Sequence, residues 1–104
     1  MPATATEEQY TAMEQVLMND EGPISDRMRT CFTLKSLGTP RAIDALGCGF
    51  KANSDLLKHE VAYCIGQIQD TYAIPLLTSV LADADGQGGI VRHEVRQTRA
   101  APRR

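Results

Sequence analysis

Two histidine–glutamate dipeptides, His59-Glu60 and His93-Glu94, are the residues of this sequence whose chemistry suits a metal ion. They stand in the matching tetrapeptides Lys58 to Val61 and Arg92 to Val95, which are 34 residues apart. Neutral imidazole combined with carboxylate is the ligand set of non-haem iron and similar divalent metals. A single dipeptide of this kind is most often an exposed polar feature of a helix. Two at equivalent positions of a repeat favour a shared site, although spacing alone leaves both interpretations open.

The three cysteines, Cys31, Cys48 and Cys64, form no C-x-x-C pair, and none adjoins either dipeptide. This argues against a thiolate zinc site. An odd number of widely spaced cysteines is typical of reduced thiols on buried helix faces. We therefore expect a cytoplasmic protein.

Residues that start and stop helices recur along the chain. The alternation of apolar and polar residues that is typical of strands does not appear. Thr6 and Gln9 fit a capping box that opens a first helix, which the turn residues 19–23 stop. Ser25 is the expected N-cap of a second helix that ends at Gly38, and Thr39-Pro40 opens a third.

The second half of the sequence continues in the same way. Ser54 or Asp55 opens a fourth helix, and Asp70-Thr71 opens a fifth with Pro75 in its first turn. A sixth helix starts near Ile90 and ends before Pro102. The sequence therefore predicts an all-α protein.

An internal repeat relates these helices. A shift of 31 residues places Phe32 on Tyr63 and Leu34 on Ile65, and a shift of 34 relates the two dipeptides. Helix pairs that recur every 30-odd residues are typical of an α-solenoid. We expect Phe32 and Tyr63 to stack between repeats, and Lys58 and Arg92 to lie in solvent.

The third repeat looks incomplete, because the apolar pattern stops after Val95 at Arg96-Gln97-Thr98-Arg99. Residues 92–104 hold five of the 11 basic residues of the chain. We therefore expect a repeat domain over residues 1–95 and a frayed or disordered Arg/Pro tail over residues 96–104, the C-terminus being truncated or replaced. The exposed end of the incomplete repeat would suit a homodimer.

Composition excludes two classes of partner. Eleven basic residues stand against 13 acidic ones, for a net charge of -2, which argues against a nucleic-acid binder. No stretch approaches the roughly 20 apolar residues that span a bilayer, and the N-terminus lacks the features of a secretory signal. We expect neither nucleic acid nor membrane as a partner.

The residues around the dipeptides resemble deoxyhypusine hydroxylase. The resemblance runs in order from about residue 7 to residue 95. It is carried by four segments: Arg29 to Gly38, Leu56 to Gln67, Ala73 to Leu77 and Val91 to Glu94.

The resemblance implies a HEAT-like repeat iron enzyme, a monooxygenase. That family uses dioxygen to hydroxylate the deoxyhypusine side chain of one translation factor, its protein substrate, and so forms hypusine. Its two homologous halves each give two His-Glu pairs to a di-iron centre. By resemblance His59, Glu60, His93 and Glu94 are the metal ligands of the N-terminal half, and which glutamate binds iron and which attracts the cationic substrate arm stays open.

The chain departs from the family in having two pairs rather than four, which gives half of the di-iron ligands. Four protein ligands are too few to hold two irons with orienting partners. The alternative interpretation is a HEAT-repeat interaction module without catalysis, in which the His-Glu pairs contact a partner.

Overall fold

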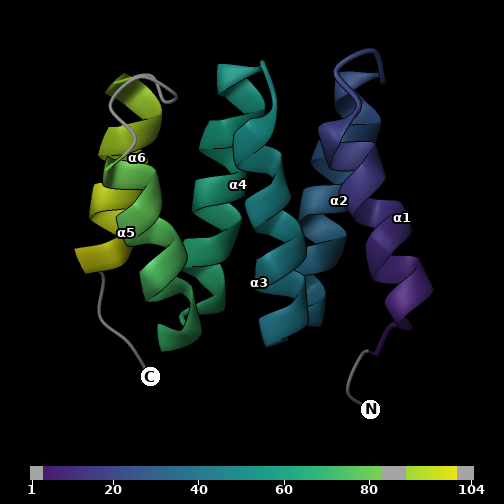
Figure 1. The fold of residues 1–104 in the computed structure, drawn as a ribbon, viewed down its shortest axis with the longest axis horizontal. Coiled ribbons are helices and arrows are strands. Elements are labelled where there is room, and N and C mark those ends of the chain that lie inside the picture. Colours follow the sequence, from purple (N-terminus) through teal and green to yellow (C-terminus); the bar gives the residue numbers. More distant parts are fainter. Residues whose placement is uncertain (1–3, 83–88, 101–104) are drawn as a thin grey trace.

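The helices stack as pairs in two layers (Figure 1). The computed structural model describes residues 4–82 and 89–100, without the side chains of residues 90, 99 and 100. One layer holds α1 (Glu7–Met18), α3 (Pro40–Gly47) and α5 (Ile74–Ala82), and the other holds α2 (Ile24–Leu37), α4 (Asp55–Ile68) and α6 (Gly89–Ala100). Two 3-10 turns, η1 (Cys48–Lys51) and η2 (Thr71–Ala73), complete the connections. The slab measures 36 × 35 × 18 Å, and the predicted all-α solenoid of stacked helix pairs is confirmed.

Most helix ends lie where the local sequence places them. Thr6 and Gln9 form the expected capping box on α1, with each backbone N–H donating to the other residue's side chain. Gly38 ends α2 at φ 64, a left-handed conformation that glycine adopts without a Cβ penalty. Thr39 and Ser54 accept hydrogen bonds from Ala42 and Leu57 and so cap α3 and α4.

The start of α2 differs from expectation. The helix begins at Ile24 with Pro23 at the N-cap, and no side chain caps it, so the prediction for Ser25 is wrong. The Pro23 carbonyl accepts from the backbone N–H groups of Asp26 and Arg27. Pro23 has φ -59, the value to which its ring confines it, and its carbonyl accepts the first hydrogen bonds of the helix in place of any side-chain cap.

The last helix extends beyond the border expected at residue 95, since α6 runs to Ala100. Thr98 lies against α4, where its hydroxyl donates to the Ala62 carbonyl at 3.4 Å. Residues 96–100 therefore continue the sixth helix, which the sequence expects to end before Pro102. The expected loop at residues 83–88 and the rest of the tail at residues 101–104 lie outside the described residues.

A single apolar core fills the space between the two layers. Its fully buried side chains come from five of the six helices: Leu17, Cys31, Leu34, Ile43, Leu46, Leu57, Val61, Cys64, Ile65, Val91 and Val95. Cys31 and Cys64 are buried free thiols, as expected, whereas Cys48 is only half-buried. Val91 and Val95 show that α6 buries an apolar face as completely as the earlier repeats do.

Each helix of the second layer carries a cation in its first turn, and in α2 and α6 this cation contacts the end of the preceding helix. Arg27 donates to the Leu17 carbonyl in the last turn of α1, at 2.6 Å, and Arg92 donates to the Leu81 carbonyl in the last turn of α5, at 3.2 Å. Lys58 occupies the equivalent place in α4 and is buried. Cations are favoured at helix C-termini, where carbonyls lack intrahelical partners. The expectation that Lys58 and Arg92 lie in solvent is wrong, because Lys58 is buried and the half-buried Arg92 reaches back to the end of α5.

No helix among the described residues has the length and apolar character needed to cross a membrane.

Replacing Arg27 with alanine should lower the free energy of unfolding by about 2–4 kcal/mol, because it leaves the Leu17 carbonyl without its side-chain donor and takes the cationic partner from the Asp20 carboxylate. Urea unfolding followed by circular dichroism measures the change. Arg29→Ala is the control, since that exposed side chain should contribute less than about 0.5 kcal/mol. Equal effects of the two variants would show that the buried contact is not what stabilises the first repeat.

The Asp20 carboxylate should make the fold acid-sensitive. It accepts from the Asn53 backbone N–H at 3.0 Å and from Arg27 at 3.2 Å, and the first contact above all lowers the pKa of Asp20 below its usual 3.8. A lowered carboxyl pKa gives stability that is present above the unfolded value and is lost as pH falls through the folded value. The stability difference between the wild type and Asp20→Asn should therefore shrink below about pH 4, as urea unfolding at a series of pH values would measure. A difference that stays constant down to pH 2 would contradict this linkage.

Candidate metal centre

The two His-Glu dipeptides lie in the same layer, on helices that are packed side by side. His59 and Glu60 are in the second turn of α4, and His93 and Glu94 are in the second turn of α6. The packing of α4 against α6 is extensive (Figure 1). Their contacts advance together along both helices, from His59 with Glu94 to Ala62 with Thr98, so the two helices run parallel. Parallel packing brings equivalent turns of two repeats to the same height.

One histidine and one glutamate of the four meet across this interface. His59 Nε2 lies 3.3 Å from Glu94 Oε2, with 42% of the His59 side chain and 20% of the Glu94 side chain exposed. The contact joins residues of different repeats, so it depends on the stacking of helices rather than on a local sequence motif. An imidazole nitrogen and a carboxylate oxygen are therefore presented together near the surface of the second layer.

The other two predicted ligands have different surroundings. His93 is exposed on α6, while Glu60 is half-buried on the side of α4 that faces α2. Within residues 4–82 and 89–100, no group of three or more His, Cys, Asp or Glu side chains is close enough to hold one ion. The structure thus brings together two of the four residues and does not gather all four.

Thiolate chemistry is unfavourable beside this pair. Burial raises the pKa of Cys31 to about 12 and that of Cys64 to about 11, and the nearby Glu60 carboxylate adds to both shifts. Both thiols therefore stay protonated at neutral pH. Imidazole and carboxylate are the metal-binding groups that this layer presents.

A shallow cleft of about 210 Å³ opens between α4 and α6 beside Glu94. It combines one carboxylate and one phenol ring with three amides, a hydroxyl and a glycine: Tyr63, Gly66, Gln67, Gln69, Glu94, Gln97 and Thr98. Tyr63 is 42% exposed and Phe32, its equivalent in α2, is 43% exposed, so neither ring is part of the buried core. These aromatic rings instead lie at the surface of the layer that carries the His-Glu residues.

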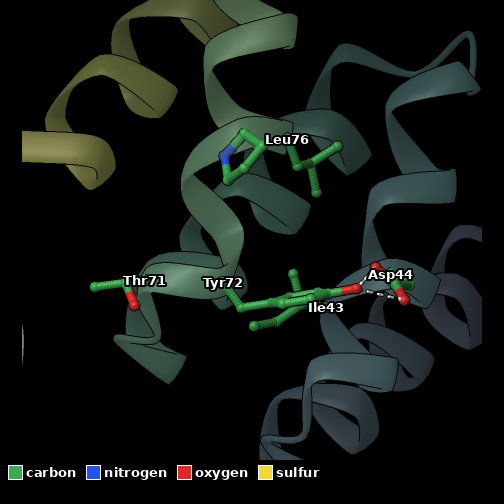
Figure 2. Close-up of a pocket in the computed structure, with 6 residues that line it drawn as sticks. Ile43, Asp44, Thr71, Tyr72 and Leu76 are labelled. Carbon is green, nitrogen blue, oxygen red and sulfur yellow. Dashed lines mark hydrogen bonds between the residues drawn. The ribbon is translucent and has the colours of Figure 1, made fainter.

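A second cleft lies between α3 and α5, in the other layer (Figure 2). Its lining consists of Ile43, Asp44, Thr71, Tyr72, Pro75 and Leu76. The Tyr72 hydroxyl donates to both Asp44 carboxylate oxygens, at 3.0 and 3.1 Å, which raises the pKa of Tyr72. The carboxylate of this cleft is thus already hydrogen-bonded, and the cleft brings no second metal-binding side chain to it.

The sequence of this chain is similar to those of known deoxyhypusine hydroxylases. The chain is 46% identical over 96 residues to that enzyme from Drosophila pseudoobscura pseudoobscura, and 47% identical over 89 residues to the human enzyme. These matches cover 92% and 86% of this chain. The resemblance inferred from the sequence is confirmed. The solved structure of human deoxyhypusine hydroxylase in complex with glycerol superposes with a TM-score of 0.80 at 44% identity.

The similarity to deoxyhypusine hydroxylase covers only part of each relative. The chain matches 32% of the Drosophila enzyme, 29% of the human enzyme and 32% of the solved human chain. It therefore spans about a third of the length of these proteins. The family model of the PBS lyase HEAT-like repeat matches residues 57–83, which agrees with the stacked helix pairs.

The His59–Glu94 contact should contribute little to stability, because both side chains are partly exposed and such pairs add about 1 kcal/mol or less. A double-mutant cycle with His59→Ala and Glu94→Ala, followed by urea unfolding in chelator, measures the coupling. A coupling energy above about 2 kcal/mol would identify a structural ion pair rather than a pair available for a ligand.

Proposed function

We propose that this chain carries half of the iron-binding residues of a deoxyhypusine hydroxylase, the monooxygenase that forms hypusine on a translation factor. The observation that carries the proposal is the 3.3 Å contact between His59 Nε2 and Glu94 Oε2 across two repeats. The family resemblance over nearly the whole chain supports the same function.

The donor pair fits one metal ion. Two ligands at adjacent corners of an octahedral ion with bonds of about 2.1 Å lie about 3.0 Å apart, close to the separation observed here. Imidazole and carboxylate are also the donors that suit non-haem iron. With small side-chain adjustments, both atoms can bind the same ion.

The contact suggests different roles for the two glutamates. Glu94 would hold iron together with His59, and the exposed His93, one residue before Glu94, would complete the set on α6. Glu60 stands outside the His59–Glu94 pair, and its carboxylate would attract the cationic arm of the substrate. When bound, iron would activate dioxygen for hydroxylation of an aliphatic carbon.

The surface beside the pair suits the substrate arm of a modified lysine. Tyr63 offers an exposed aromatic face next to Glu94, where methylene groups can pack. In the same cleft the neutral amides of Gln67 and Gln97 can accept or donate hydrogen bonds. The chain itself would thus bind and orient the side chain that is hydroxylated.

Two His-Glu pairs supply at most half of a di-iron centre, so the complete activity needs ligands beyond these four residues. We propose that the HEAT-like domain over residues 1–95 corresponds to the N-terminal half of the hydroxylase, acting in the cytoplasm, where its three thiols stay reduced. A second copy of the chain in a homodimer is one source of the missing ligands.

A non-catalytic interaction module is the second candidate. It is favoured by the exposed rings of Phe32 and Tyr63, which lie on one layer as partner-binding residues do in helical-repeat proteins. Such a module would be indifferent to metal, so metal binding separates the two candidates.

Iron(II) added anaerobically should raise the melting temperature of the chain, because a metal bound only by the folded state stabilises it. His59→Ala and Glu94→Ala should each weaken binding about tenfold or more in a calorimetric titration, whereas Glu60→Ala should keep the metal and lose affinity for an amine-bearing peptide. Glu21→Ala, an exposed acid remote from the pair, is the control. A melting temperature that is the same with iron(II) and with chelator would overturn the hydroxylase proposal and favour the interaction module.

A further inference from the structure

Gly66 of α4 packs directly against Thr98 of α6, next to the candidate centre. The Cβ of an alanine at Gly66 would lie 2.6 Å from Thr98 Cγ2 and 2.9 Å from Thr98 Oγ1. Cβ atoms in real proteins essentially never approach this closely. The two helices can therefore keep their present separation only if residue 66 has no side chain.

Thr98 also contacts α4 through a hydrogen bond of its own. Its hydroxyl donates to the Ala62 carbonyl at 3.4 Å, one turn before Gly66 on α4. Thr98 Cβ lies 3.2 Å from the place of an added Cβ, a tight contact that a shift of a few tenths of an ångström relieves, so Cγ2 and Oγ1 are the atoms that exclude a side chain at residue 66. Threonine in a helix is moreover confined to few rotamers.

The same helix pair carries the metal-binding contact a short distance away. Gly66 follows His59 by seven residues and Thr98 follows Glu94 by four, which is about 10 Å and about 6 Å along the helix axes. Because the helices are rigid over two turns, the separation fixed at Gly66 and Thr98 also sets the gap that His59 and Glu94 span.

Helix propensity gives no reason for a glycine here. Alanine is the better helix former by about 1 kcal/mol in a helix interior, and Gly66 lies inside α4 with an ordinary helical conformation. The close contact with Thr98 supplies the reason that propensity does not.

We propose that Gly66 and Thr98 are positioning residues, whose contact sets the α4–α6 separation at which His59 and Glu94 can hold one metal ion. The claim about metal binding rests on the function proposed above. The claim that Gly66 and Thr98 set the distance between His59 and Glu94 does not depend on that function. A widening of about 1 Å, the amount that an added Cβ demands, would carry the two donor atoms beyond the roughly 3 Å that adjacent ligands of one ion require.

The test compares four variants by two measurements. The first is the nuclear Overhauser effect between the His59 ring protons and the Glu94 side-chain protons in metal-free protein, and the second is the affinity for cobalt(II), a spectroscopic substitute for iron(II). Gly66→Ala should abolish the nuclear Overhauser effect between His59 and Glu94 and weaken cobalt(II) binding about tenfold. Thr98→Ala loosens the contact from the other side and keeps the fold. It should weaken both the nuclear Overhauser effect and cobalt(II) binding, but to a lesser degree than Gly66→Ala.

The combination Gly66→Ala/Thr98→Ala should recover both signals, because the added methyl group fills the space that the threonine side chain leaves. A purely structural effect would not be rescued in this way. Gly47→Ala is the matched control, since its Cβ would lie 2.9 Å from Leu76 Cδ2 in the other layer. This variant should change the urea midpoint and leave both signals as in the wild type.

Either of two results would overturn the proposal: an unchanged His59–Glu94 signal in Gly66→Ala, or an equal loss of that signal in Gly47→Ala. A wild type that shows the proton contact but binds no cobalt(II) would instead refute the metal-binding function. The nuclear Overhauser effect between His59 and Glu94 would still decide whether Gly66 and Thr98 position these two side chains.

Discussion

The arrangement of the candidate site depends on one constraint, the parallel packing of α4 against α6. Repeat-equivalent helices in a solenoid run in the same direction, so their second turns lie at the same height. This allows an imidazole on one helix to meet a carboxylate on the next, 35 residues later in the sequence. Both side chains are partly exposed, so their contact contributes little to the stability of the fold. The apolar core and the close contacts between the helices must therefore hold the two backbones in place.

The contact also shows why a sequence repeat predicts only part of the arrangement of side chains. A shift of 34 residues aligns His59 with His93, yet His59 meets Glu94. Consecutive residues of an α-helix point about 100° apart, so the residue that faces a neighbouring helix is chosen by how each helix is rotated in the stack. That rotation follows from the packing of the core and cannot be obtained from the spacing of the dipeptides.

Local signals predicted the helices well and the environments of long side chains poorly. The capping box at Thr6, the glycine at residue 38 and the Thr39-Pro40 start needed only neighbouring residues, and the structure has all three. Lys58 was assigned to the wrong environment, because a long lysine stem can be buried even though its end is charged, and the exposure of the Phe32 ring could not be predicted. Both outcomes depend on tertiary contacts that the order of residues does not contain.

The three buried or half-buried cations and the His-Glu residues follow from a common register. Arg27, Lys58 and Arg92 begin the helices of one layer, and Lys58 and Arg92 directly precede the two histidines. Arg27 is followed by Met28 and Arg29, so the first repeat keeps the cation without the metal-binding residues. The cation thus belongs to the register that all three repeats share, whereas the His-Glu residues occur in two repeats only. Where the cation also contacts the end of the preceding helix, as Arg92 does at the Leu81 carbonyl, it anchors the helix start from which the next turn presents its metal-binding residues.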